Sequence, residues 1–160
     1  MAENRIQIGE VAPKFTLPDQ DGHRVKLADF KGEWVVVYFY PKDDTPGCTK
    51  EACQFTAGIK SFEKLNATVI GVSPDDEASH RNFIDKFKLK VRLLCDPDRE
   101  MMEKYGAWGT KKLYGKETVG VIRSTLLIDP SGKIVHHWKS VQADGHADHV
   151  RRKLEALQAE

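Results

Sequence analysis

The stretch that most restricts the fold is a continuous run of apolar, largely β-branched residues from Trp34 to Tyr40. Because successive side chains of a strand point to opposite faces, an uninterrupted apolar run indicates a strand buried on both faces. Such a strand lies in the middle of a sheet that is covered on each side. The run ends at Pro41, and a polar turn then leads to Cys48 at the start of a predicted helix. The chain is therefore predicted to be an α/β protein.

Other segments of the chain supply elements to surround this strand. The predicted strands are 12–18 and 23–27, which form a hairpin ahead of the main fold, then 67–73, 91–95, 121–129 and 133–138. The predicted helices are 46–65, 75–88, 99–105 and 144–157. Residues 107–120 are rich in Gly and Lys, and we expect them to form a long surface loop. The pattern predicts a central mixed sheet flanked by helices.

Length and charge narrow the classes of function. A chain of 160 residues fits one domain, residues 1–160, with a real hydrophobic core. The net charge of +1 gives no electrostatic reason to expect nucleic acid as a partner. No apolar run reaches the roughly 20 residues of a membrane span, and the start of the chain lacks the apolar core of a signal peptide. We therefore expect a cytoplasmic protein with no membrane or nucleic-acid partner.

The chemistry of Cys48 depends on where its helix begins. A thiol is a weak nucleophile until it ionises, and the unpaired N–H groups at a helix N-terminus favour the thiolate. Pro46 suits the first helical position because its missing N–H has no helical partner there, and Thr45 is the expected N-cap. Glu51 is expected to support the first turn electrostatically, and Pro41 fixes the backbone where the strand ends. Cys48 is thus predicted to be a nucleophile.

A second cysteine, Cys53, follows five residues after Cys48 in the same predicted helix. Residues five apart on an ideal α-helix have Cα atoms about 8.6 Å apart and point about 140° apart. A disulfide needs Cα atoms within about 7 Å, so these two cysteines cannot bond while both are helical. If they bond, the first turn or two of the helix must unwind. Three cysteines in a chain of this length do not indicate a disulfide scaffold.

Several separated motifs resemble those of peroxiredoxins. The pattern Pro41-x-x-x-Thr45-x-x-Cys48 matches their active-site signature, and the position of Cys53 is similar to the bacterioferritin-comigratory-protein (PrxQ) branch. The segments 9–15 and 120–125 agree in order and spacing, so the resemblance covers nearly the whole chain. It implies a thioredoxin-like fold, to which the N-terminal hairpin is an extension. It also implies thiol-dependent reduction of hydrogen peroxide and organic hydroperoxides, as part of antioxidant defence.

The resemblance also implies roles for individual residues. The cysteine that matches Cys48 is peroxidatic, becoming a sulfenic acid, and the one that matches Cys53 resolves it as a disulfide. Positions matching Pro41, Thr45 and Glu51 shape the site, and a strand arginine matching Arg123 stabilises thiolate and peroxide. The expected substrate-binding residues are Thr45, Gly47, Cys48 and Arg123. No cofactor or metal is expected. Thioredoxin or a similar dithiol is the expected reductant, and the branch is often monomeric.

Each of these residues has a simpler interpretation. Cys53 could pack as a small apolar residue, Glu51 could be a carboxylate on the helix surface, and Arg123 could face solvent from an edge strand. The more specific hypothesis is that Glu51 holds Arg123 and that Arg123 donates to the sulfur of Cys48. Cys95 follows two leucines in a predicted strand, which favours core packing.

Parts of the sequence also fit other functions and a metal site. A disulfide exchanger of the thioredoxin kind usually has Cys-x-x-Cys, and the sequence has no such spacing. A redox-controlled binding protein or holdase could use the unwound helix as a switch, but it would not consume peroxide catalytically. His146 and His149 could share a helix face for a metal, although a solvated face is expected. Asp43 and Asp44 are expected to be turn residues rather than cation ligands.

Overall fold

The computed structural model describes residues 6–113 and 115–160, so part of the predicted polar lead-in lies outside the described residues. Its strands are β1 (Thr16–Pro18), β2 (Arg24–Lys26), β3 (Trp34–Phe39), β4 (Ala67–Ser73), β5 (Arg92–Cys95), β6 (Trp108–Leu113), β7 (Lys116–Val121), β8 (Ser124–Ile128) and β9 (Ile134–Trp138). Its helices are α1 (Pro46–Ala57), α2 (Ile59–Lys64), α3 (Glu77–Phe87), α4 (Glu100–Lys104) and α5 (His146–Gln158), with a 3-10 helix η1 (Leu27–Phe30).

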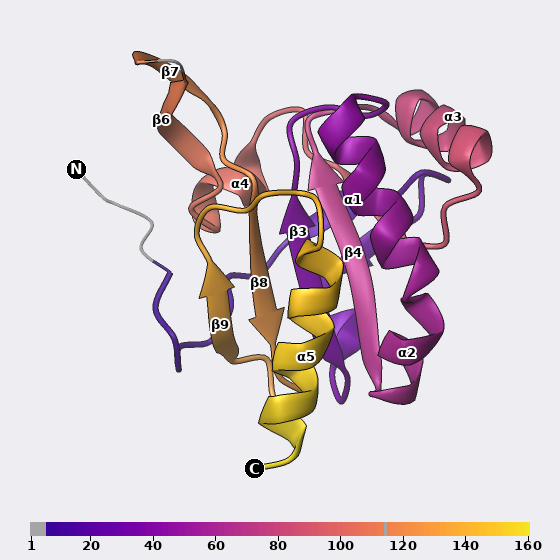
Figure 1. The fold of residues 1–160 in the computed structure, drawn as a ribbon, viewed down its shortest axis with the longest axis vertical. Helices are drawn as coiled ribbons and strands as arrows, with labels where there is room; N and C mark the ends of the chain where they lie inside the picture. Colours follow the sequence, from indigo (N-terminus) through magenta and orange to yellow (C-terminus); the bar gives the residue numbers. More distant parts are fainter. Residues whose placement is uncertain (1–5, 114) are drawn as a thin grey trace.

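The centre of the fold is a mixed five-stranded sheet in the order β5-β4-β3-β8-β9 (Figure 1). Strand β3 is the middle strand, parallel to β4 and antiparallel to β8. Strands β1 and β2 form the predicted antiparallel hairpin, which is a separate small sheet. The predicted α/β architecture, a mixed sheet flanked by helices, is confirmed.

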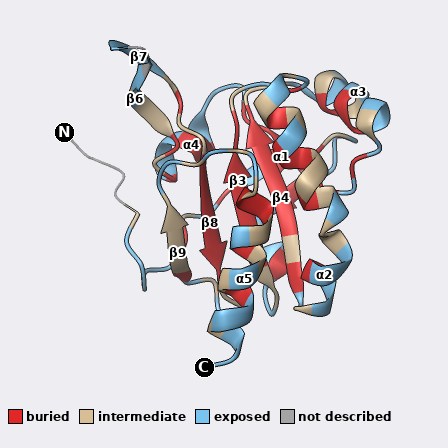
Figure 2. Cartoon of the chain, viewed as in Figure 1, coloured by how far each residue is buried: buried red, intermediate tan, exposed pale blue. Residues whose placement is uncertain are grey.

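Alternate side chains of the central strand enter two different hydrophobic cores. One core contains Val36, Tyr38 and Tyr40 and is closed by helices α1, α2, α3 and α5. The other contains Val35, Val37 and Phe39 and is closed by the N-terminal hairpin, η1 and α4. Figure 2 shows strands β3, β4 and β8 of the sheet largely buried, the edge strand β9 mostly intermediate, and the outer faces of the helices exposed. The predicted burial of this strand on both faces is confirmed.

The predicted helix 46–65 is in fact two helices. Helix α1 ends at Ala57, Gly58 lies between them with φ −94° and ψ 4°, and α2 begins at Ile59. Glycine has the lowest helix propensity of any residue except proline, because its unfolded backbone has more freedom to lose. The axis is therefore interrupted at this glycine, one turn beyond Cys53.

The predicted loop 107–120 is wrong. Strands β6 and β7 form an antiparallel hairpin there, with Trp108 paired to Val121 at its base. Gly115, close to the tip, has a φ of +78°, which glycine adopts without strain. Most of β7 is exposed, so the hairpin is held by backbone hydrogen bonds rather than by a buried face. A strand exposed on both sides carries no alternation of apolar and polar residues, which is why the sequence did not indicate it.

The predicted strand 121–129 is also divided, and the division places Arg123. Strand β7 ends at Val121 and pairs only with β6, whereas β8 begins at Ser124 in the central sheet. Arg123 lies in the connection between the two sheets rather than in a strand, and its carbonyl accepts a hydrogen bond from the backbone N–H of Val141 (3.0 Å). The other predicted strands and helices are present, with bounds that differ by a few residues at most.

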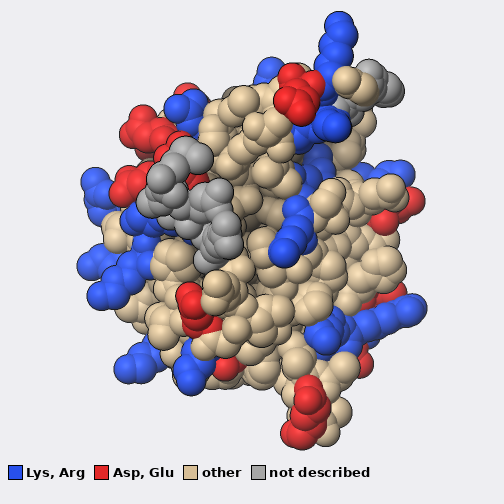
Figure 3. All heavy atoms as spheres, turned by 90° about the vertical axis from the view of Figure 1, so that its left-hand side faces the viewer, with Lys and Arg blue, Asp and Glu red and all other residues tan. Residues whose placement is uncertain are grey.

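The surface carries both signs of charge. On the face shown in Figure 3, Lys and Arg side chains are interspersed with Asp and Glu. Within the described part of the chain, every helix is too short or too polar to cross a bilayer.

Candidate active site

Cys48 lies in the first turn of α1, directly beyond the carboxyl end of the central strand β3. Pro46 occupies the first helical position, and the backbone N–H of Thr49 donates to the carbonyl of Thr45 (2.8 Å) as the first helical bond. The Cys48 residue is 1% exposed and its thiol is free. The helix start predicted from the sequence is therefore present, and it directs unpaired N–H groups toward the region of the sulfur.

Thr45 holds the predicted N-cap position but does not cap the helix with its side chain. Its hydroxyl donates to the carbonyl of Lys42 (2.9 Å) and so closes the loop on itself. Pro41, half-buried, stands at the start of this loop. The predicted N-cap position of Thr45 is therefore confirmed, while its hydroxyl stabilises the loop rather than the N–H groups of the helix.

Arg123 brings together two residues from a different part of the chain. Its Nη2 donates to the Sγ of Cys48 (3.1 Å), and its Nη1 donates to Oε1 of Glu51 (2.6 Å). The Glu51 side chain is fully buried and that of Arg123 is 19% exposed. The surface alternatives for Arg123 and Glu51 are therefore wrong, and the predicted contacts among the three residues are present. Glu51 lies beyond the first helical turn, so it does not support that turn as expected.

Burial and neighbouring charges shift the pKa values of Arg123 and Glu51 in opposite directions. Burial by itself would lower the pKa of Arg123, but Glu51 and Cys48 beside it raise that pKa above its usual value. Burial raises the pKa of Glu51 to about 7, although Arg123 opposes the increase. The Oε2 atom of Glu51 is buried with no hydrogen-bond partner among the described residues. Arg123 therefore remains charged beside the sulfur, while Glu51 exchanges a proton near neutral pH.

Gly47 leaves the space that Arg123 needs. A Cβ atom at this position would lie 3.3 Å from Nη2 of Arg123, which is tighter than ordinary van der Waals contact. Since that nitrogen is the one that donates to Cys48, a side chain at Gly47 would press on the contact itself. The structure thus gives a steric reason for the glycine that the sequence analysis placed among the substrate-binding residues.

Cys53 is half-buried on the same helix as Cys48, and its thiol is also free. Both cysteines lie within the continuous helical segment of α1, so their ideal Cα separation of about 8.6 Å applies. Cys53 borders a shallow pocket together with Thr45, Pro46, Gln54 and others, whereas Cys48 does not line it. The two thiols therefore open toward different sides of the helix.

Two other residues considered from the sequence, Cys95 and His146, make no hydrogen bond to Cys48 among the described residues. Cys95 is buried, as expected for a core residue, and burial followed by the charge of Glu77 raises its pKa to about 12. His146 is buried rather than solvated, and its Nε2 hydrogen-bonds the hydroxyl of Thr125 (2.8 Å). Burial lowers the pKa of His146 to about 4, so its imidazole is neutral at pH 7.

A polar cluster of Asp43, Asp75 and His80 lies behind the active-site loop and was not predicted from the sequence. Asp43, expected to be a turn residue, is 6% exposed and hydrogen-bonds His80 on α3. The two residues are far apart in the sequence, so only the fold brings them together. Asp43, Asp75 and His80 have donor atoms close enough to hold a metal ion, as have Asp19, Asp21 and His23. In the first group those atoms are engaged in hydrogen bonds within the protein, and in the second the carboxylates of Asp19 and Asp21 already accept from backbone N–H groups and from Arg81, so neither group is assigned a metal.

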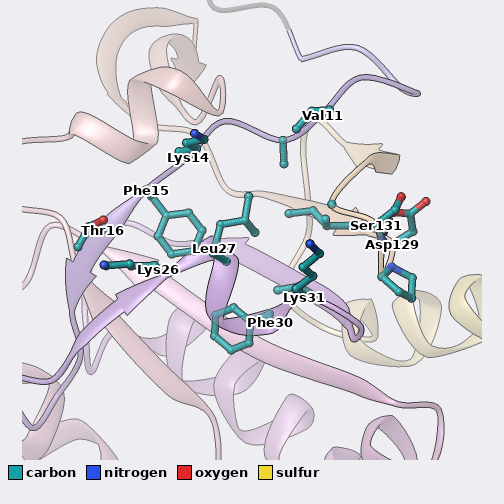
Figure 4. A pocket seen from close by; sticks show the side chains of 16 residues that line it. Val11, Lys14, Phe15, Thr16, Lys26, Leu27, Phe30, Lys31, Asp129 and Ser131 are labelled. Carbon is teal, nitrogen blue, oxygen red and sulfur yellow. Dashed lines mark hydrogen bonds between the residues drawn. The ribbon is translucent and has the colours of Figure 1, made fainter.

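An apolar pocket of about 340 Å³ lies near the other end of the sheet (Figure 4). Phe15, Phe30 and Val35 line it, and the lysines Lys14 and Lys31 border it. None of the residues around Cys48 contributes to it. The pocket is therefore separate from the thiol site.

Comparisons with known proteins agree with this geometry. The model of the AhpC/TSA family matches residues 8–137. The chain is 45% identical to peroxiredoxin Bcp of Bacillus subtilis over 152 residues, which cover 95% of each chain. Its fold is similar to peroxiredoxin Q of Xanthomonas campestris, with a TM-score of 0.84 and 39% identity over 89% of this chain and 90% of that one. It is also similar to PrxQ of Xylella fastidiosa, with a TM-score of 0.90 and 36% identity over 98% and 99% of the two chains.

Proposed function

The chain belongs to the AhpC/TSA family, among the peroxiredoxins of the Bcp/PrxQ kind, and from this membership we propose how its site works. A peroxiredoxin is a thiol peroxidase, an oxidoreductase that reduces a peroxide at the expense of a thiol reductant. We propose that Cys48 is the peroxidatic residue, with Thr45, Gly47 and Arg123 at the peroxide and Pro41 and Glu51 shaping the site. The observation that carries the proposal is the 3.1 Å contact between Nη2 of Arg123 and Sγ of Cys48.

In the first step the thiolate of Cys48 attacks the terminal oxygen of the peroxide, in line with the O–O bond. The S–O bond forms as the O–O bond breaks, and the leaving alkoxide or hydroxide takes up a proton. Arg123 and the backbone N–H groups of the first helical turn offer positive charge to the leaving oxygen. The sulfur becomes a sulfenic acid.

In the second step Cys53 condenses with the sulfenic acid, forming the Cys48–Cys53 disulfide and releasing water. Because both residues are helical in the structure, we propose that the start of α1 unwinds before this bond forms. In the third step a dithiol, which we propose to be thioredoxin, reduces the disulfide through a mixed-disulfide intermediate.

The substrate class rests on the chemistry of the site and on a relative. The site acts on the O–O bond, which hydrogen peroxide and organic hydroperoxides share. The bacterioferritin comigratory protein of Xanthomonas campestris is described as having alkyl peroxide reduction activity. We therefore propose that this chain accepts both hydrogen peroxide and alkyl hydroperoxides.

A coupled assay with thioredoxin, its reductase and hydrogen peroxide tests the proposal. Cys48→Ser is expected to abolish turnover. Cys53→Ser is expected to reduce about one equivalent of peroxide and then fail to recycle. Full steady-state activity of Cys53→Ser would exclude Cys53 as the resolving residue, and activity of Cys48→Ser would exclude the proposed nucleophile. Mass and thiol counts after one equivalent of peroxide show whether a single intramolecular disulfide forms.

A further inference from the structure

Asp43 lies in the loop between β3 and α1, five residues before Cys48, and it is held by an unusual number of donors. Its Oδ1 accepts from the hydroxyl of Tyr40 (2.6 Å). Its Oδ2 accepts from the hydroxyl of Ser79 (2.8 Å) and lies 2.7 Å from Nδ1 of His80. The carboxyl group of this loop residue is therefore surrounded by partners, and two of the three lie on α3.

His80 faces a hydrogen-bond acceptor with each of its ring nitrogens. Nδ1 faces the carboxylate of Asp43, and Nε2 lies 2.8 Å from the backbone carbonyl of Leu94. Neither acceptor can donate, so both nitrogens must carry hydrogen for both bonds to form. The imidazole is then a cation, and its side chain is 0% exposed while that of Asp43 is 3% exposed. His80 and Asp43 thus form a buried, charge-assisted pair between the loop and α3.

The pair is part of a one-sided attachment of the loop. The backbone N–H of Asp43 donates to Oδ2 of Asp75 (2.8 Å), just ahead of α3. Lys86 on α3 pairs with Asp44, but both side chains are largely exposed, and an exposed ion pair contributes little. The buried His80–Asp43 pair is therefore the strong connection between α3 and the segment that leads into the Cys48 helix.

We propose that the His80–Asp43 pair is a positioning device that keeps the active-site loop and the start of α1 in the peroxide-reactive conformation, and so slows resolution by Cys53. This inference depends on the proposed function for the second thiol. Neither residue touches the reacting atoms, and each acts through the loop backbone. Loss of the pair favours the unwound conformation in which Cys53 can reach the sulfenic acid.

Slowing resolution has a chemical consequence. A sulfenic acid that waits for Cys53 can react with a second hydrogen peroxide, which transfers one oxygen to give a sulfinic acid and water. The His80–Asp43 pair therefore sets the ratio of disulfide to sulfinic acid at a given peroxide concentration. The pair also makes this ratio depend on pH, because neutral His80 can donate only one of its two hydrogen bonds. The titratable groups that face His80 are Asp43, Asp75 and Tyr40.

The first test uses no peroxide. In reduced wild-type protein, long-range imidazole NMR at pH 7 is expected to show both nitrogens of His80 protonated. Hydrogen exchange of the amides from Thr49 to Gln54 is expected to be about tenfold faster in His80→Gln, the factor usual for a lost bond to a charged group. Arg81→Gln, on the same helix but paired with Asp21 and Asp85, is the matched control and should exchange like wild type. A neutral His80, or exchange in His80→Gln equal to that in the control, overturns the proposal.

The second test measures the partition of oxidised Cys48. Turnover with excess hydrogen peroxide, followed by intact mass, is expected to give about tenfold less sulfinic acid in His80→Gln than in wild type or Arg81→Gln. Asp43→Asn removes the same charge pair from the loop side and is expected to give the same decrease in sulfinic acid. It takes the place of His80→Gln if His80→Gln does not fold. An unchanged ratio in the folded variants overturns the proposal. If peroxide does not oxidise Cys48 at all, the proposed function fails, while the exchange result still decides the role of the pair.

Discussion

Arg123 contacts two side chains of α1 with one planar group. Its two terminal nitrogens reach Cys48 and Glu51 at the same time, with the fixed geometry of a guanidinium fork that an ammonium group lacks. The fully buried carboxyl group of Glu51 fixes the guanidinium of Arg123 in position. Gly47 has no side chain, which leaves room for that guanidinium beside the sulfur. The positive charge is therefore held at the sulfur before a substrate arrives.

Replacing Arg123 tests this arrangement. We expect Arg123→Ala to slow peroxide reduction by about 10²–10³-fold, the usual cost of removing one fixed donor from a developing oxyanion. Arg123→Lys should recover only part of the rate, since lysine cannot contact Cys48 and Glu51 with a fork of donors. Stopped-flow oxidation by hydrogen peroxide measures the rate. A rate for Arg123→Ala within twofold of wild type would remove Arg123 from the mechanism.

Glu51 is expected to make stability depend on pH. Its pKa in the folded protein is about 7, above the ordinary value of 4.5, because burial disfavours the carboxylate. Between these two values the folded protein holds a proton that the unfolded chain has lost, so stability falls as the pH rises from about 4.5 to 7. The full shift corresponds to about 3 kcal/mol.

Urea unfolding of reduced protein at several pH values measures this effect. Glu51→Gln, which cannot ionise, should flatten the decrease over the same window. The matched control is Glu63→Gln, which removes an exposed carboxylate from α2 and should leave the wild-type slope. Equal slopes for wild type and Glu51→Gln would show that this carboxyl group titrates normally.

At the scale of elements, burial decided what could be predicted from the sequence. Strand β4 has the bounds that its apolar run predicts, and β3 ends one residue earlier than its run. The hairpin β6–β7 was missed because it is held by backbone pairing and carries little apolar surface. The break at Gly58 depends on one glycine inside a helical pattern, where sequence alone gives only a weaker helix.

The site shows the same division between local and long-range information. The helix start at Pro46 and the position of Cys48 follow from residues close in sequence, and the structure has both. The contact of Arg123 with Glu51 was a hypothesis that a resemblance suggested. The His80–Asp43 contact had no local signal, because a single histidine in a helical segment is indistinguishable from a surface residue until the helix is packed.

Helix α1 has a second attachment, at the side opposite to the loop. Nε2 of Gln54 donates to Oδ1 of Asp144 (2.8 Å), and Oε1 accepts from the N–H of Gly145 (2.9 Å), next to α5. Gln54 directly follows Cys53, so these bonds hold the helix in the region that has to loosen for the disulfide we propose. We expect Gln54→Ala to accelerate disulfide formation about fivefold to thirtyfold, since one or both of these bonds are lost and each contributes about 1 kcal/mol.

Quenched-flow alkylation after one equivalent of peroxide gives the rate of disulfide formation in Gln54→Ala. Lys50→Ala is the matched control, because Lys50 is exposed on the same helix and alanine does not weaken a helix. A faster closure in Lys50→Ala than in Gln54→Ala would assign the effect to the helix itself rather than to its attachment.

At the scale of the molecule, α1 belongs to the active site and to a hydrophobic core at once. Cys48, Ala52 and Phe55 are buried members of the core on the helix-covered face, and the ring of Phe55 stacks on Tyr38 with centroids 4.7 Å apart. Unwinding the start of α1 removes Cys48 and Ala52 from that core and separates Glu51 from Arg123. The disulfide that we propose between Cys48 and Cys53 would therefore couple oxidation to the stability of the whole fold.

This coupling predicts that the oxidised protein is less stable than the reduced one, although it gains a covalent bond. A disulfide that closes so short a loop stabilises by only about 2 kcal/mol through the unfolded chain. Unwinding the start of α1 also loses the burial of Cys48 and Ala52 and several helical hydrogen bonds, at about 1 kcal/mol for each bond, and together these losses exceed that gain. We expect the Tm of the oxidised protein to be about 5 °C lower, at roughly 2–4 °C per kcal/mol for a domain of this size.

Thermal circular dichroism of reduced and singly oxidised samples measures the difference, with Cys53→Ser as the control that cannot close the bond. An oxidised Tm equal to or above the reduced value would mean that α1 stays folded after oxidation, and Cys48 and Cys53 would then have to be joined to other partners.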